Sequence, residues 1–218
     1  MSRACPDWNS DDPRDDPRII ANARTLWPEI EREALTRPMP SLDLALAWHK
    51  RLYAGVRVPE PDYVGNIRDS DPGHPCLVGY EVIVGSSLGV RAAGVPSALA
   101  TFIGAVGNVV ATLDRVIAPG AVPSDRHLVQ AVVRLCAFTQ GEWIRIHPFA
   151  NGNGRTARVW ANWIAVRYGL PAFVAIKPRP GHALFAGAAA RSMSGDHQVT
   201  EALFVELLND ALAAIQTP

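Results

Sequence analysis

Apolar residues recur at helical spacing over most of the chain. Ile19, Leu26 and Ile30 share one face of an amphipathic helix, although Pro28 interrupts the pattern and predicts a kink or two short helices. Ser41 is a good N-cap for a second helix that ends before Gly55. The pattern predicts further helices at about 96–117, 124–143, 153–169, 182–193 and 199–215.

A different pattern occupies the region between the second and third predicted helices. Four prolines between residues 56 and 75 predict an irregular segment. Tyr80 and Val84 then belong to an alternating run, and Gly85-Ser86-Ser87 can turn the chain back toward Val90, which predicts a β-hairpin. The expected fold is therefore mainly α with one hairpin.

The N-terminus differs in composition from the rest. Residues 1–17 are rich in Asp, Pro and Arg and poor in apolar residues, which is typical of a flexible arm. We therefore divide the chain into an N-terminal arm with its helical segment at 1–40, a candidate regulatory region, and a main domain at 41–218.

Charge and cysteine usage narrow the class of protein. Lys plus Arg and Asp plus Glu number 21 each, which argues against a protein that coats nucleic acid. The N-terminus lacks the apolar region of a secretory signal, and no apolar run approaches the ~18 residues of a membrane span. Cys5, Cys76 and Cys136 show no C-x-x-C spacing and are expected to be reduced thiols. We expect a soluble, cytoplasmic protein without nucleic-acid or membrane partners.

Candidate chemistry concentrates in the segment 147–158, His-Pro-Phe-Ala-Asn-Gly-Asn-Gly-Arg-Thr-Ala-Arg. Gly152 and Gly154 let consecutive backbone N–H groups face one concavity, and the helix that begins there adds its positive end. Arg155 and Arg158 lie three positions apart, on one helix face, where both can reach phosphate oxygens. His147 lies beside this anion nest and suits general-base work.

Two other interpretations of this segment compete with a phosphate site. Each residue alone suits a tight structural turn, but their clustering in one short stretch argues against it. Gly152-x-Gly154-x-x-Ala157 also matches a dinucleotide-binding pattern, which requires a preceding strand and an acidic residue ~20 positions later. The preceding segment is predicted to be helical, and no Asp or Glu occurs between Thr156 and Gly195. We reject the dinucleotide interpretation.

The segment resembles the signature of the Fic family, H-x-F-x-[D/E]-G-N-G-R-x-x-R, at every fixed position except Asn151. Weaker similarity runs from Ala47-Trp48-His49 to Leu208. It includes Tyr63-Val64-Gly65-Asn66-Ile67-Arg68, which is similar to the family's glycine-Arg turn, and Ser194-Gly195-Asp196, which is similar to its late Gly-Asp turn. The resemblance implies a Fic-type helical bundle with a β-hairpin flap.

The resemblance also implies an activity. Fic enzymes typically move AMP from ATP onto a Ser, Thr or Tyr hydroxyl of a target protein, with magnesium bridging the phosphates. On that pattern His147 would be the general base, Arg155 would brace the β-phosphate and Arg158 the γ-phosphate. The hairpin at 79–93 would be a flap that aligns the target by strand addition. The implied nucleotide site consists of Gly152, Asn153, Gly154, Arg155 and Arg158.

The departure at Asn151 affects the expected metal site. The family usually has an acidic magnesium ligand there, and an amide oxygen can coordinate the ion only without a carboxylate's charge. We therefore expect a weak magnesium site. Transfer of another phosphate-linked group (UMP, GMP, phosphocholine or phosphate) stays open, as does a nucleotide-binding regulator or toxin-like module that turns over poorly.

Regulation has one candidate residue. Many Fic proteins carry an inhibitory helix, [S/T]-x-x-x-E-[G/N], whose Glu pairs with the second arginine of the signature. Thr25 and Glu29 have this spacing, whereas Pro28 and Ile30 depart from the pattern and favour a solvated Glu29 on an ordinary helix. Self-inhibition, an antitoxin partner and no regulation all stay open.

Overall fold

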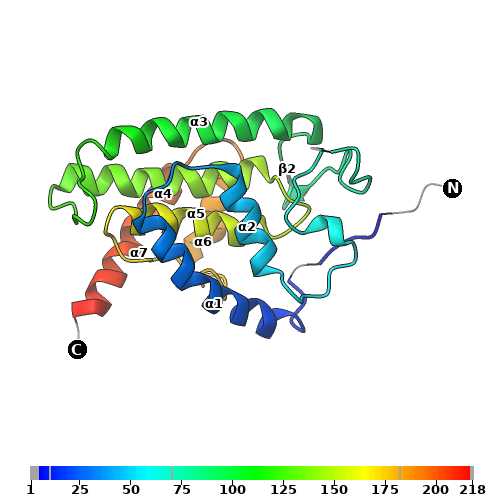
Figure 1. Cartoon of the computed structure of the whole chain (residues 1–218), viewed down its shortest axis with the longest axis horizontal. Helices are drawn as coiled ribbons and strands as arrows, with labels where there is room; N and C mark the ends of the chain where they lie inside the picture. Colours follow the sequence, from blue (N-terminus) through cyan, green and yellow to red (C-terminus); the bar gives the residue numbers. More distant parts are fainter. Residues whose placement is uncertain (1–4, 10, 70, 182, 217–218) are drawn as a thin grey trace.

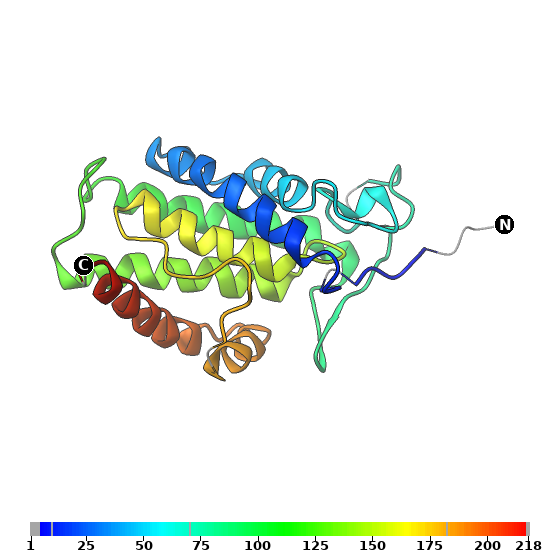
Figure 2. The same ribbon diagram turned by 90° about the horizontal axis from the view of Figure 1, so that it is seen from below.

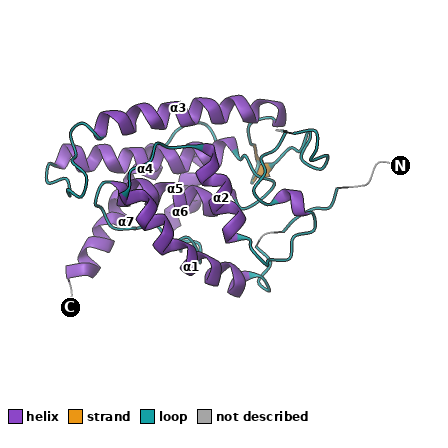
Figure 3. Cartoon of the chain, viewed as in Figure 1, coloured by secondary structure: helices purple, strands orange, loops and turns teal. Residues whose placement is uncertain are grey.

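The computed structural model describes residues 5–9, 11–69, 71–181 and 183–216, and the chain is mainly helical in this part (Figures 1 and 3). The predicted mainly α fold with one hairpin is confirmed. Residues 1–4, 10, 70, 182 and 217–218 lie outside the described part of the chain. The helices are α1 (Asp16–Leu35), α2 (Leu42–Leu52), α3 (Val95–Leu113), α4 (Arg126–Ile146), α5 (Asn153–Arg167), α6 (Ala183–Ser192) and α7 (Gln198–Gln216).

Helix α5 forms the centre of the bundle. Nearly all its side chains are buried, and α1, α2 and α4 pack around it (Figure 2). Trp160 of α5 contacts Trp48 of α2 and Trp143 of α4, with ring centroids 4.9 Å and 5.9 Å apart. Such aromatic contacts bury large areas in fixed geometries. The N-terminus of α5 is therefore held rigidly by the core.

Helix α1 continues through Pro28 as one helix, so the predicted alternative of two short helices is wrong. Ile19, Leu26 and Ile30 are buried on both sides of the proline, against α2 and α5. Packing of this apolar face outweighs the hydrogen bond that proline cannot donate. The helical segment before residue 40 therefore shares its core with the main domain.

The predicted hairpin is present but its paired region is short. Strands β1 (Ile83–Val84) and β2 (Ser87–Leu88) pair antiparallel, with Ile83 opposite Leu88. The predicted strands extended to Tyr80 and Val90, whose carbonyls instead accept hydrogen bonds from the buried side chain of Arg68. A side chain thus replaces strand pairing at the base of the hairpin.

Two of the three cysteines are bonded, which corrects the expectation of reduced thiols. Cys5 and Cys76 form a disulfide with their Cα atoms 5.3 Å apart, whereas Cys136 is a buried free thiol. The two partners are 71 residues apart in the chain, so local spacing could not reveal the pair. The disulfide joins the N-terminal arm to the loop that precedes the hairpin.

Helix α3 corrects the expectation that no apolar segment approaches the length of a membrane span. The segment Ala92–Leu113 is long and apolar enough to cross a membrane by length and composition alone. One side of α3, including Leu99, Phe102 and Val106, is buried, and the helix packs on α4 along the edge of the bundle (Figure 1). The apolar character on this side is what a core helix of a bundle requires.

Candidate active site

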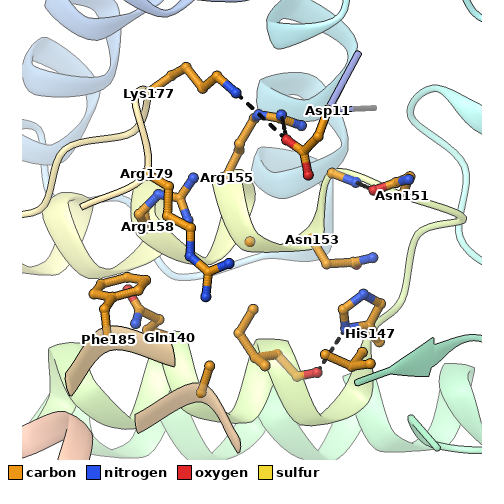
Figure 4. Close-up of a pocket in the computed structure, with 15 residues that line it drawn as sticks. Asp11, Gln140, His147, Asn151, Asn153, Arg155, Arg158, Lys177, Arg179 and Phe185 are labelled. Atoms are coloured by element: carbon orange, nitrogen blue, oxygen red, sulfur yellow. Dashed lines mark hydrogen bonds and ion pairs between the residues drawn. The ribbon is translucent and has the colours of Figure 1, made fainter. Parts of the chain in front are cut away.

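The predicted site residues come together in one pocket of about 240 Å³, between the end of α4 and the start of α5 (Figure 4). The loop 147–152 joins the two helices, so the rigid packing of α4 on α5 fixes both of its ends. The sequence-predicted residues that line the pocket are His147, Asn151, Gly152, Asn153, Gly154, Arg155 and Arg158.

His147 ends α4 in a left-handed backbone conformation, with φ 53°. This conformation is uncommon for a residue with a side chain and is often found at functional sites. Its Nδ1 lies 3.0 Å from the carbonyl oxygen of Ile144, which can only accept, so Nδ1 carries the proton and Nε2 keeps its lone pair. Burial lowers the pKa of His147 to about 4, so the imidazole is neutral at physiological pH. This neutral tautomer can accept a proton.

The turn before α5 depends on Gly152. Its φ is +80°, and a Cβ at this position would lie 2.5 Å from the Tyr53 hydroxyl and 2.8 Å from Nε2 of His49. Only glycine fits both the conformation and the space. The amides of Asn153 and Gly154 belong to the first turn of α5, where a helix offers no intrahelical acceptor. The backbone here is therefore suited to hold an anion.

Asn153 takes a structural role that the sequence resemblance does not imply. Its side-chain oxygen accepts from the N–H of Phe149 at 2.9 Å, and its amide donates to the carbonyl of the same residue at 2.9 Å. Both polar groups are thus used to close the loop. Asn153 can contribute to phosphate binding through its backbone, whereas its side chain shapes the nest.

Arg155 and Arg158 point toward the pocket from the first turns of α5 (Figure 4). The Arg155 guanidinium donates to the Tyr53 hydroxyl and to the carboxylate of Asp11. Arg158 donates to the carbonyl of Ile176 at 2.7 Å and 3.1 Å. Burial, aided by Arg155, lowers the pKa of Arg158 to about 9, so its guanidinium is still a cation at neutral pH.

Two further cations line the pocket, although from the sequence alone, where they follow an apolar stretch, a surface position is favoured over a contact with ligand. Lys177 and Arg179 belong to the segment between α5 and α6, and their side chains approach those of Arg155 and Arg158 (Figure 4). No spacing pattern relates this segment to the motif, so only the fold reveals the cluster. Four cations around one small cavity favour a ligand with several negative charges.

His49 packs against the loop 147–152, which forms the nest. It is fully buried, its ring stacks on Phe149 with centroids 3.8 Å apart, and burial lowers its pKa to about 3. The N–H of Gly65 donates to its Nδ1 at 2.9 Å, so Nε2 carries the proton and donates to the carbonyl of Asn151 at 3.0 Å. A neutral histidine thus joins the glycine-Arg turn to the loop.

Arg68, at the end of the glycine-Arg turn, holds the loop 147–152 and the hairpin together. Its side chain is fully buried and donates to the carbonyls of Ile146 and His147 at 3.1 Å and 2.8 Å. It also donates to the carbonyls of Tyr80 and Val90 at 2.7 Å and 2.9 Å. One guanidinium therefore fixes the backbone of His147 relative to both ends of the hairpin.

The pocket does not form a magnesium site of its own. The side-chain oxygen of Asn151 accepts from the N–H of Gly152 at 2.7 Å, and its amide donates to the carbonyl of Trp8 at 2.7 Å. The described residues contain no group of three or more His, Cys, Asp or Glu side chains that could hold a metal ion. Magnesium sites in proteins usually need one or two carboxylates. The donor set beside these four cations does not fit a protein-held magnesium ion.

Glu29 is not brought to the pocket. It lies on α1 and forms an ion pair with Arg51 of α2, and both side chains are partly exposed. Arg158, the arginine that an inhibitory glutamate would contact, donates to a backbone carbonyl instead. This placement agrees with the solvated alternative for Glu29.

Comparison with known families gives one match. The model of the Fic/DOC family matches residues 40–165, which is more than half of the chain and includes the whole loop and both arginines. No protein of curated function matches the sequence.

Solved structures with Fic domains have a similar fold. A Fic domain containing signaling protein from Bacteroides thetaiotaomicron aligns with a TM-score of 0.57 at 15% identity, over 88% of this chain and 70% of that one. Fic-1 from C. elegans aligns with a TM-score of 0.56 at 19% identity, over 91% of this chain and 50% of that one. The N-terminal Fic domain of a Bartonella effector protein from Bartonella sp. AR 15-3 aligns with a TM-score of 0.55 at 15% identity, over 88% and 80%. At such identities the likeness shows the fold alone.

Proposed function

This chain belongs to the Fic/DOC family and carries a Fic-type transferase domain, and from that premise we propose that it transfers AMP from ATP onto a Ser, Thr or Tyr hydroxyl of a target protein. The observation that carries the proposal is the combination, in one pocket, of a neutral histidine with four cations and a helix N-terminus. The cations and the nest suit a triphosphate, and the histidine suits removal of a hydroxyl proton.

The proposed reaction uses these groups in a fixed order. The target hydroxyl oxygen bonds to the α-phosphorus while the bond from that phosphorus to the oxygen shared with the β-phosphate breaks. Nε2 of His147 takes the hydroxyl proton, since Nδ1 is engaged with Ile144. Pyrophosphate leaves with the bonding electron pair, and Arg155 and Arg158 stabilise its charge. A magnesium ion carried by ATP would neutralise phosphate charge, and no side chain of this chain is assigned to hold it, since position 151 lacks a carboxylate.

A nucleotide-binding regulator with little turnover is the second candidate. Two observations favour it: position 151 carries an amide, and Asp11 already contacts Arg155, where a phosphate would bind. Within the transferase reading, the same amide makes a donor other than ATP the main rival. These candidates differ in which group of the donor, if any, becomes attached to the target protein.

Labelled ATP separates the candidates. The protein is incubated with candidate targets and ATP that is radiolabelled at either the α- or the γ-phosphate. Transfer of the α-label alone supports AMP transfer, whereas transfer of the γ-label indicates phosphorylation. Nucleotide binding without label on any protein would contradict ATP-dependent transfer and favour the regulator or another donor. A reaction with the His147→Ala variant serves as the blank.

We expect Asn151→Asp to lower the magnesium concentration for half-maximal activity by about tenfold. At ~4 Å and an effective dielectric of about 20, a new carboxylate attracts the ion by several kcal/mol, of which roughly 1–2 survive desolvation. Asn151→Ala is the matched control, because it also removes the hydrogen bond to Trp8 but adds no charge. If Asn151→Asp binds magnesium better yet transfers AMP no faster, Asn151 serves a different donor and AMP transfer is the wrong assignment.

A further inference from the structure

The N-terminal arm contributes Asp11 to the lining of the pocket. We call residues 5–9 and 11–15 the strap. Trp8 anchors it, since this side chain is 6% exposed and its ring lies 4.9 Å from Tyr53, centroid to centroid. The hydroxyl of Tyr63 donates to the carbonyl of Pro6 at 2.8 Å, and Asn151 donates to that of Trp8 at 2.7 Å. The strap is thus held against Tyr53, Tyr63 and the loop residue Asn151.

Asp11, just beyond this anchor, places its carboxylate among the cations (Figure 4). It pairs with Arg155, and its Oδ1 lies 3.6 Å from Nζ of Lys177. The Arg155 side chain is only 4% exposed, whereas that of Asp11 is 75% exposed. A buried guanidinium requires an anionic partner, and Asp11 supplies one from the solvent side. An incoming phosphate would need the same guanidinium nitrogen.

Both ends of the strap are fixed. Its C-terminal end continues into α1, where Arg57 contacts the carboxylate of Asp15 at 3.0 Å. Its N-terminal end is tied covalently to the loop before the flap by Cys5–Cys76. Where a protein meets a reducing compartment, disulfides are usually transient or redox-sensing. Reduction would leave the N-terminal end held only by noncovalent contacts.

We propose that the strap is a redox-controlled autoinhibitory element, in which Asp11 occupies the anion position on Arg155 while Cys5–Cys76 keeps it there. A cellular dithiol releases it by thiol–disulfide exchange: two electrons break the S–S bond, each sulfur gains a proton, and the dithiol is oxidised to a disulfide. This inference rests on the proposed function only in taking the pocket to receive a phosphate chain. An inhibitory helix would place a Glu on the second arginine of the signature. The strap instead places Asp11, from a segment that precedes α1, on the first arginine, Arg155.

Binding of inorganic pyrophosphate tests the role of Asp11 without requiring any transfer reaction. Isothermal titration calorimetry in the absence of metal should show Asp11→Asn binding pyrophosphate about tenfold or more tightly than the oxidised native chain, because a competing charge-assisted hydrogen bond is lost. Asp12→Asn is the matched control. Asp12 pairs with Arg14 and lies 3.9 Å from Arg57, so its removal should change the affinity less than twofold. Equal affinities for Asp11→Asn and Asp12→Asn would overturn the proposal.

Reduction tests the role of the disulfide without any substitution. Dithiothreitol should raise the pyrophosphate affinity of the native chain toward that of Asp11→Asn, and Cys76→Ser should bind tightly with or without reductant. An affinity that reduction leaves unchanged would overturn the redox part. Should these affinities change as expected while no variant transfers label from ATP, the strap inference stands and the proposed AMP transfer fails.

Discussion

His147→Ala is expected to lower the rate of AMP transfer by about 10²–10⁴-fold, the usual contribution of a general base. Nucleotide affinity should stay within a few-fold, because in the proposed reaction the nest and the arginines, rather than the imidazole, hold the phosphates. Rates from labelled ATP and affinities from calorimetry check the two parts separately. His127→Ala is a matched control, since His127 is exposed at the start of α4. This substitution should change neither the rate of AMP transfer nor the nucleotide affinity.

The same residue predicts an unusual pH dependence. A base works in its neutral form, and burial lowers the pKa of His147 to about 4. Since kcat/KM reports the ionisation of the free enzyme, it should stay level from pH 8 to about 5 and fall only below that. An exposed histidine would lose activity below its ordinary pKa of ~6.5. An acidic limb near pH 6.5, or turnover by His147→Ala close to the native rate, would remove this histidine from the mechanism.

Much of the fold could be predicted because it depends on local periodicity. Helices α3 to α7 follow the 3.6-residue pattern of apolar side chains, and Ser41 caps α2 as expected, accepting from the N–H of Leu44. The errors came from tertiary contacts that local patterns do not encode. Packing on α5 keeps α1 continuous through Pro28, and Arg68 replaces strand pairing at the base of the hairpin.

The candidate site likewise contains residues that the sequence predicts and residues that only the fold brings to the pocket. Seven of its residues lie within one contiguous segment, where glycines, arginines and a histidine at fixed spacing indicate a phosphate site from sequence alone. Lys177, Arg179 and Asp11 reach the pocket from segments before and after it, and nothing in their local sequence distinguishes them from surface charges. The interpretation of Lys177 as a surface residue failed because it judged the side chain by its neighbours in sequence.

The largest expected effect on stability belongs to Arg68, the guanidinium that joins the loop 147–152 to the hairpin. Arg68→Met keeps an apolar stem but removes the donors to four backbone carbonyls. Each buried acceptor left without a partner costs about 1–3 kcal/mol, and this loss is partly offset because a buried charge no longer needs desolvation. This desolvation cost is visible in Arg68, because burial lowers its pKa more than the nearby Glu81 carboxylate and other acidic groups raise it. We expect a net loss of about 3 kcal/mol, seen as a melting temperature lower by roughly 6–12 °C.

Two comparisons distinguish this role from a general loss of charge. Arg51→Met removes a guanidinium from a half-exposed ion pair with Glu29 and should cost less than about 1 kcal/mol. Arg68→Lys keeps the charge but cannot reach all four carbonyls from one ammonium group, so its melting temperature should lie between those of the native chain and Arg68→Met. Below these melting temperatures, the released loop lets His147 leave its left-handed conformation. The rate of transfer should then fall at least tenfold while nucleotide affinity changes little. If Arg68→Met melts like the native protein, the four carbonyls find other donors and the guanidinium does not hold the flap to the loop.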